Sequence, residues 1–325
     1  GNGSMAYVGN QGTQNGLNTA YQGNKVTLSG NNSGFTGQTV IGFGAGAAGG
    51  LTIDSETRLG ANPAAFTYNQ LDLNRGQLTT TATMTLSNAN RGILLDVNGG
   101  DFDPAAGTTL TINCQLFSPS LPGGGVTAGN LNKTSPGTLV LNSPNSGFNG
   151  MLYVDSGYNN FNDGVVQIAN NTVMANAHSP IYIRNYGNTS STLQLNGASG
   201  NIALPQAISV NGRSSTTPAI QNVAGTNTLG GGISPYGSGN YIVQSDAGIL
   251  NIGGTTTSSD GGADTITFQG SGTVNLSGSV SGPMSINKAG SGTLNFAANS
   301  SYTGSTTVNQ GTLALQNPNT PVLHL

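Results

Sequence analysis

Residues 287–315 read Asn-Lys-Ala-Gly-Ser-Gly-Thr-Leu-Asn-Phe-Ala-Ala-Asn-Ser-Ser-Tyr-Thr-Gly-Ser-Thr-Thr-Val-Asn-Gln-Gly-Thr-Leu-Ala-Leu. In this stretch, a short segment of alternating apolar and polar residues is followed by an Asn/Ser-rich turn, an aromatic-x-Gly triplet and a second alternating segment. Strict alternation is typical of a strand that buries one face. The stretch therefore predicts short strands joined by a compact turn.

The same skeleton occurs at residues 25–41 and 132–157. Internal repetition of this kind is typical of proteins built from stacked structural units. The three triplets are expected to form equivalent corners, with each glycine in a conformation or a close contact that a Cβ atom would disturb. They are Phe35-Thr36-Gly37, Phe148-Asn149-Gly150 and Tyr302-Thr303-Gly304.

A lysine opens each of the three segments, at Lys25, Lys133 and Lys288. We expect each of these side chains to place a single charge at the edge of a coil, because a charged amine is rarely buried without a partner.

Strand-like segments recur along the chain, and two architectures fit their spacing. The last apolar residues of five successive segments fall 12 to 15 residues apart, at Leu141, Val154, Ile168, Ile183 and Leu195. An antiparallel sandwich would use the Asn-Gly pairs as hairpin turns. A parallel β-solenoid would use them at its corners, because Asn and Gly tolerate positive φ. These pairs are Asn98-Gly99, Asn149-Gly150, Asn196-Gly197 and Asn211-Gly212.

The composition favours the solenoid. Charged residues make up 6% of the 325 residues, and 52 residues are glycine. Coils stacked about 4.8 Å apart place like side chains above one another, which favours ladders of uncharged Asn, Thr and Ser over stacked charges. Eight lysines and arginines are too few for a nucleic-acid surface. No apolar run approaches the roughly 18 residues of a membrane-spanning helix.

The repeated segments resemble the autotransporter-associated β-strand repeat, the passenger-associated repeat of bacterial surface and secreted proteins. Members of that family carry Lys-x-Gly-x-Gly-Thr-Leu, a Tyr-Thr-Gly turn and Asn-x-Gly-Thr-Leu, as residues 288–315 do. The resemblance implies a right-handed parallel β-helix that is exported and then displayed or released.

We therefore expect an all-β protein in which residues 1–325 form one elongated β-solenoid domain, a right-handed parallel β-helix. With about 20 to 25 residues in each coil, the chain would make about 13 to 16 coils.

Two carboxylate pairs are the candidates for chemistry. Asp101 and Asp103 either share one face of a strand, as a calcium site or an acid/base pair, or lie in a solvated turn closed by Pro104. Asp260 and Asp264 resemble a single imperfect copy of a glycine-aspartate calcium turn, so a plain loop is expected there. Calcium binding by either pair is left open.

No catalytic, cofactor-binding or metal-binding residue is predicted, and no enzymatic activity is expected. His178 and His324 fit no catalytic motif and are expected to be structural or surface residues. Cys114 is expected to be a small buried residue.

The predicted function is that of an extracellular structural protein at the bacterial cell surface. A solenoid must cover the open strands of its terminal coils, and neither end of the sequence resembles a capping helix or charged loop. We therefore expect copies of the chain to join head to tail into a filament or sheath. The expected assembly residues are Met5, Tyr7, Val322, Leu323 and Leu325.

Three alternatives stay open. A monomeric passenger could act as an adhesin that binds cell-surface glycans, through exposed aromatics such as Tyr153, Tyr158 and Phe161. A polysaccharide-active β-helix enzyme would project several Asp, Lys and Arg side chains into one groove. An ice-binding protein would carry a regular threonine lattice, for which the threonine-rich residues 79–86 are the candidate.

Overall fold

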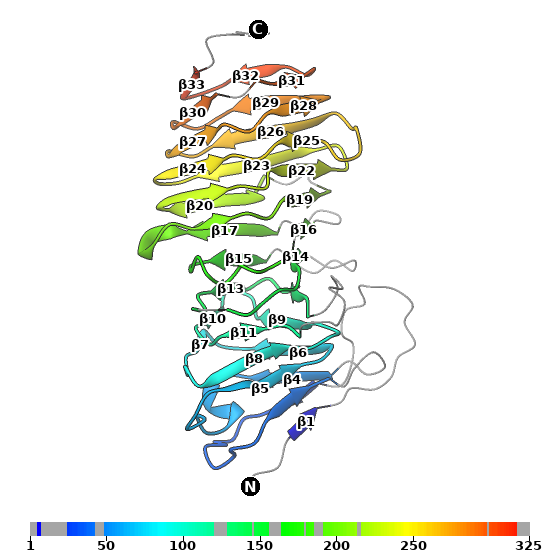
Figure 1. Ribbon diagram of the computed structural model, residues 1–325, viewed down its shortest axis with the longest axis vertical. Helices are drawn as coiled ribbons and strands as arrows, with labels where there is room; N and C mark the ends of the chain where they lie inside the picture. The colour runs from blue at the N-terminus through cyan, green and yellow to red at the C-terminus, as the bar shows by residue number, and fades with distance from the viewer. Residues whose placement is uncertain are drawn as a thin grey trace. The chain divides into compact units, whose positions relative to one another are not determined.

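The computed structural model describes residues 5–7, 25–42, 49–119, 129–144, 146–155, 164–178, 180–184, 191–212, 216–297 and 299–316. Half of the chain is strand, and the described residues contain no α-helix. The strand pairings determined among them are all parallel. The predicted parallel β-solenoid is confirmed (Figure 1).

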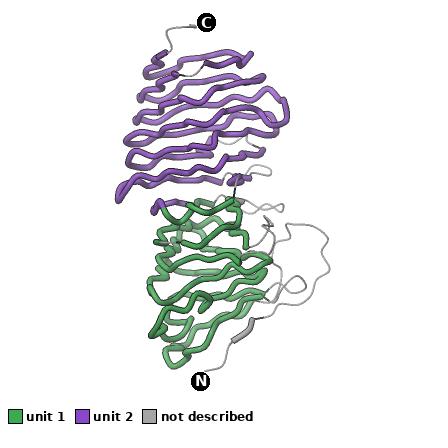
Figure 2. The backbone as a smooth tube through the Cα atoms, in the orientation of Figure 1, with its two compact units in different colours: residues 1–166, 172–178 green, residues 167–171, 179–325 purple. Residues whose placement is uncertain are grey.

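The backbone forms two compact units (Figure 2). The first comprises Gly1–Val166 and Thr172–His178, and the second comprises Gln167–Asn171 and Ser179–Leu325. Strand β15 (Val165–Ile168) contains the division between them.

Three parallel sheets form the first unit. Their hydrogen-bonded orders are β1-β3-β5-β8-β11, β2-β4-β6-β9-β12-β14 and β7-β10-β13. Consecutive strands of the chain fall in different sheets, so the chain circles the core. The strands of the first sheet are β1 (Met5–Tyr7), β3 (Thr39–Ile41), β5 (Thr67–Leu73), β8 (Arg91–Leu95) and β11 (Leu116–Phe117). Those of the second are β2 (Lys25–Thr27), β4 (Gly49–Ile53), β6 (Gly76–Thr80), β9 (Gly100–Pro104), β12 (Leu131–Lys133) and β14 (Leu152–Asp155). Those of the third are β7 (Met84–Leu86), β10 (Thr109–Ile112) and β13 (Thr138–Leu141), and the 3-10 helix η2 (Glu56–Leu59) interrupts one coil.

The second unit is built in the same way. Its first sheet contains β17 (Thr192–Asn196), β20 (Ile220–Ala224), β23 (Asn240–Ser245), β26 (Asp264–Gln269), β29 (Met284–Lys288) and β32 (Thr306–Val308). A second sheet contains β18 (Ala203–Leu204), β21 (Thr226–Leu229), β24 (Ile249–Ile252), β27 (Thr273–Leu276), β30 (Thr293–Phe296) and β33 (Thr312–Leu315). The third side is formed first by β16 (Ile181–Arg184), β19 (Ile208–Asn211) and β22 (Ile233–Tyr236), and then by β25 (Thr256–Thr257), β28 (Val280–Gly282) and β31 (Ser301–Tyr302). The 3-10 helix η3 (Gly197–Ser199) follows β17.

The core is a set of apolar columns. Leu51 pairs with Leu78, and Leu78 pairs with Phe102, and all three side chains are fully buried. Leu250, Val274 and Leu294 stack in the same way in the second unit. Burying such a side chain contributes about 1.5–3 kcal/mol relative to leaving it exposed, so stability accumulates coil by coil.

The coils are longer than the sequence predicts. Thr293 pairs with Thr312, but Met5 pairs with Thr39, so one turn takes between 19 and 34 residues. The expectation of 13 to 16 coils is wrong, because the protein makes about nine turns. Segments such as 54–66 lengthen a coil without adding a paired rung.

The sandwich alternative is excluded in the described residues. Asn98-Gly99 connects β8 to β9, which belong to different sheets, and Asn196-Gly197 begins η3. Gly99 has φ 72°, as expected for a corner glycine. Two expectations remain predictions: that residues 1–325 form a single domain, and that the β-helix is right-handed.

Candidate functional site

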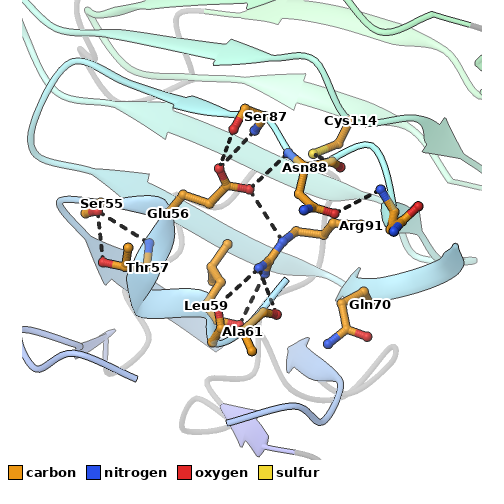
Figure 3. A network of polar contacts seen from close by, with 12 residues as sticks. Ser55, Glu56, Thr57, Leu59, Ala61, Gln70, Ser87, Asn88, Arg91 and Cys114 are labelled. Carbon is orange, nitrogen blue, oxygen red and sulfur yellow. Dashed lines mark hydrogen bonds and ion pairs between the residues drawn. The ribbon is translucent and has the colours of Figure 1, made fainter. Parts of the chain in front are cut away.

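A buried arginine lies at the centre of a polar network in the first unit (Figure 3). Arg91 is the first residue of β8, and its side chain is fully buried. Its guanidinium donates to the carbonyls of Leu59 at 3.2 Å, Gly60 at 3.3 Å and Ala61 at 3.4 Å. These carbonyls lie at the end of η2, where the backbone has no partner of its own.

Glu56, the first residue of η2, completes this network. Its Oε1 lies 3.5 Å from Arg91 Nε. Its Oε2 accepts hydrogen bonds from the backbone N–H of Ser87 at 3.0 Å and from the Ser87 hydroxyl at 2.9 Å (Figure 3). Burial lowers the pKa of Arg91, whereas the Glu56 carboxylate acts to raise it. The pair therefore fastens η2 to the next coil, which is a structural role.

Cys114 lies beside this network and is fully buried, as expected. Its Sγ is 3.3 Å from the carbonyl oxygen of Asn88, and burial raises the pKa of its thiol to about 12. The thiol is therefore unreactive at neutral pH.

Two repeat lysines are buried, contrary to expectation. Lys133 ends β12 with no exposed surface, and its ammonium donates to the Ser135 carbonyl. Lys288 ends β29 at 2% exposure, and donates to the carbonyls of Ala289 and Gly290, both at 2.7 Å. Each ammonium thus provides a hydrogen-bond donor for backbone carbonyls in the corner that follows its strand. Lys25, at the start of β2, is exposed.

Burial also changes the pKa of these two lysines. It lowers the pKa of Lys133 to about 8, although Asp103 and Asp101 act in the opposite direction. It lowers the pKa of Lys288 as well.

Asp101 and Asp103 lie on strand β9, so of the two alternatives the solvated turn is wrong. Asp101 is 1% exposed, and its Oδ2 accepts from the Thr134 hydroxyl at 3.1 Å. Asp103 Oδ2 lies 3.7 Å from Lys25 Nζ. The fold thus brings a lysine to a carboxylate that has no basic neighbour in the sequence.

The three aromatic turns precede strands of three different sheets: β3, β14 and β32. Phe148 is 1% exposed, whereas Phe35 and Tyr302 are half-buried. Tyr302 packs on Phe296 with ring centroids 6.1 Å apart. The turns share a local sequence but lie on different sides of the coil, so the expectation of equivalent corners is wrong.

Two of the turn glycines make the expected close contacts. A Cβ atom on Gly150 would collide with the carbonyl oxygen of Gly129, and one on Gly304 would collide with that of Met284. Both contacts join neighbouring coils, so the glycines allow the backbones to approach.

We expect Gly150→Val to lower the free energy of unfolding by about 1–3 kcal/mol, because the Gly129 carbonyl must move. Urea denaturation measures this loss. Gly34→Val is the matched control, since nothing lies within 4 Å of a Cβ at Gly34. Equal stability of the two variants would contradict the close contact.

The second carboxylate pair organises a turn. Asp260 accepts hydrogen bonds from the Ser258 hydroxyl at 2.8 Å and from the N–H groups of Gly262 at 2.9 Å and Gly237 at 2.8 Å. These bonds lower its pKa. Asp264 lies on β26 and accepts from Gly239 N–H at 3.2 Å. Within the described part of the chain, no three His, Cys, Asp or Glu side chains gather as a metal site.

Amide ladders run along the second unit, as the composition suggests. Gln167 donates to Gln194 at 2.8 Å, and Gln194 donates to Gln221 at 2.9 Å. Asp246 then accepts from both Gln221 and Gln244, at 2.6 and 2.5 Å. A second ladder joins Asn251, Asn275 and Asn295 through two hydrogen bonds of 2.8 Å.

Some of the other residues singled out in the sequence lie in the described part of the chain, and the rest lie outside it. Met5 and Tyr7 lie on β1, which pairs with β3. His178 is half-buried, and its backbone N–H donates to the Gly150 carbonyl at 3.0 Å. Gly37 accepts a hydrogen bond from Gln70 at 2.5 Å. The others lie outside the described residues: Tyr158, Phe161, Val322, Leu323, His324 and Leu325.

The model of the passenger-associated-transport-repeat family matches residues 131–168 and 286–315. The resemblance of these two segments to the passenger-associated repeat is therefore confirmed, while segment 25–41 lies outside the matched residues. The repeat implies a passenger-type protein that is displayed on the surface or secreted. Neither a curated protein nor a solved structure matches the chain. In the described residues, no helix has both the length and the hydropathy to cross a membrane.

Proposed function

We propose that this chain is an extracellular structural protein whose copies stack end to end into a filament or sheath at the bacterial cell surface. The observation that carries the proposal is the last described coil of the second unit. Its strands β31, β32 and β33 each pair on one side only within the described residues. An open row of strand N–H and C=O groups is a template for a further strand.

This coil also leaves apolar side chains in water. Val308 on β32 is 47% exposed, and Leu315 on β33 is 45% exposed. The equivalent residues one coil earlier are Lys288 and Phe296, which are 2% and 7% exposed. A coil of a second copy would bury Val308 and Leu315 as the structure buries their neighbours.

The backbone shows which groups such a coil would pair with. Asn309 N–H donates to the Lys288 carbonyl, and Ile286 N–H donates to the Ser305 carbonyl. Because alternate residues of a parallel strand bond to opposite sides, Val308 turns its N–H to the open side. The same reasoning applies to Leu315, since Thr312 and Gln316 donate to β30 and its continuation, at Gly292 and Phe296.

We expect the intact chain to form rods, and Val308→Pro combined with Leu315→Pro to leave a folded monomer. Proline removes the two outward donors, and an edge position tolerates it. Sedimentation velocity and negative-stain microscopy measure the assembly. Val308→Thr with Leu315→Thr is the matched control, because it keeps both N–H groups. A wild-type chain that stays monomeric, or a proline variant that still forms rods, would contradict the proposal.

We also propose that the protein has a structural role and no catalytic activity. The contacts of the two carboxylates on β9 support this proposal. Asp101 is buried and accepts a hydrogen bond from Thr134, and Asp103 lies near the ammonium of Lys25. Polysaccharide cleavage that disappears in Asp101→Asn or Asp103→Asn would overturn it.

A further inference from the structure

Three aromatic rings meet on the outside of the first unit. Phe66 is 46% exposed, Tyr68 is 54% exposed, and Phe117 is half-buried. The Phe66 and Phe117 ring centroids lie 5.8 Å apart, and those of Tyr68 and Phe117 lie 6.4 Å apart at an interplanar angle of 85°. We call Phe66, Tyr68 and Phe117 the aromatic platform.

A bulge in β5 puts Tyr68 in this position. Thr67 pairs with Arg91 and Leu71 pairs with Ile93, so residues 68–70 stand opposite the single residue Gly92 (β5 and β8 in Figure 1). Gly92 is required here, because a Cβ on it would collide with the backbone of Tyr68. Bulges of this kind re-aim a side chain and are common beside functional sites.

Hydrogen bonds from neighbouring coils hold the bulge in place. Gln38 Nε2 donates to the Asn69 carbonyl at 2.9 Å, and Gln70 Nε2 donates to the Gly37 carbonyl at 2.5 Å. The Arg91 guanidinium holds residues 59–61, where the loop to Phe66 begins (Figure 3). These bonds restrain the backbone on both sides of Phe66 and Tyr68, and the two rings stay exposed although burying them would be more favourable.

The surroundings of the platform are neutral and polar. Residues 61–70 and 113–119, which carry the three rings, include asparagine, threonine, glutamine and serine but no charged residue. These two segments therefore offer no cation to an anionic ligand, whereas the hydroxyl groups of a neutral ligand could form hydrogen bonds with their side-chain amides.

The size of the platform also limits the occupant. A Phe or Tyr side chain covers about 150–250 Å², so two half-exposed rings offer roughly 200 Å². A stable protein interface needs about 800 Å² from each partner. A second copy of the chain is therefore too large an occupant for this patch alone, whereas one face of a sugar ring matches it.

We propose that the aromatic platform binds neutral saccharides, with a sugar ring stacked on Phe66 and Tyr68 and its hydroxyl groups directed to neighbouring amides. This site is independent of end-to-end assembly and lies in the other unit from β31, β32 and β33. Tyr153 does not supply an equivalent surface, because it is half-buried and its hydroxyl donates to Met151 Sδ at 3.3 Å.

Saturation-transfer NMR and titration calorimetry of the full chain test the proposal with three probes: the pentasaccharides of cellulose, of starch and of chitin. We expect at least one probe to bind wild type. Loss of one ring should weaken that binding about tenfold in Tyr68→Ala and in Phe66→Ala. Tyr68→Phe should retain it, since the ring remains.

Tyr236→Ala is the matched control, because Tyr236 is 50% exposed and lies in the second unit. It should bind as wild type does. The proposal is wrong if none of the probes binds wild type, or if Tyr68→Ala and Phe66→Ala both bind as tightly. It is also wrong if Tyr68→Ala abolishes self-association, which would make the platform a contact between copies. Normal saccharide binding by the monomeric Val308→Pro, Leu315→Pro variant, which is expected to form no rods, separates this site from assembly.

Discussion

Arg91→Ala is expected to lower the free energy of unfolding of the first unit by about 3–5 kcal/mol, because it removes one partner of a buried ion pair. The substitution leaves Glu56 without its cation and leaves the carbonyls of Leu59, Gly60 and Ala61 without a donor. It also opens a cavity beneath η2. Equilibrium denaturation by guanidinium chloride measures the loss.

Two further variants separate the causes. Glu56→Gln should cost less than Arg91→Ala, since Gln retains a carbonyl acceptor for Ser87, and the double variant should cost less than the sum of the single ones. Arg58→Ala is the matched control, because Arg58 forms a partly exposed ion pair with Asp54 at 2.7 Å. If Arg91→Ala is no more destabilising than Arg58→Ala, the network does not hold the coil.

Asp72→Asn is expected to stabilise the protein at pH 7 and to remove part of its dependence on pH. Asp72 lies on β5 at 9% exposure, and burial followed by the neighbouring Asp96 raises its pKa from 3.8 to about 7. Its Oδ1 has no hydrogen-bond partner, and its Oδ2 lies 3.5 Å from Gln38 Nε2. The folded protein must therefore accept a buried, uncompensated charge when Asp72 ionises.

The direction of this effect follows from proton binding. Between about pH 4 and pH 7 the folded state holds the Asp72 proton and the unfolded state does not. The contribution of Asp72 is thus fully present below pH 4 and is lost as the pH rises through 7. The loss is about 1–4 kcal/mol, since each unit of pKa corresponds to about 1.4 kcal/mol.

Thermal or urea unfolding of wild type and Asp72→Asn at intervals from pH 4 to pH 8 measures the difference. Asn imitates the protonated carboxyl, so the variant should gain on wild type as the pH rises. The comparison cancels the other carboxylates, such as Asp260, whose lowered pKa acts in the opposite direction. A difference that stays constant with pH would mean that Asp72 does not titrate in this range.

The strands could be predicted because the information for them is local. In a segment such as Gly137-Thr-Leu-Val-Leu-Asn142, alternation decides which side chains face the core, and the structure has β13 at Thr138–Leu141 with the leucines buried. Like residues at a fixed spacing then favoured stacked coils over hairpins, which the parallel pairing of Leu250, Val274 and Leu294 bears out. The repeat motif at 286–315 was recognisable for the same reason, since its strands and turn are continuous in sequence.

The strand segments and the repeat motif could be predicted from the sequence because each depends on residues close together in the chain, and the recurrence and composition of these segments favoured parallel stacking. The tertiary structure decided the length of each coil, the burial of Lys133 and the partners of Arg91, because these depend on which coil lies above which. Glu56 and Arg91 are far apart in sequence and meet only because the fold brings η2 close to the start of β8 (Figure 3). Tyr68 reads as an ordinary strand residue, and only the pairing of β5 with β8 at Gly92 turns its ring outward. A parallel coil pairs residues that are 19 or more positions apart, and the alternation of apolar and polar residues within one strand does not encode that distance.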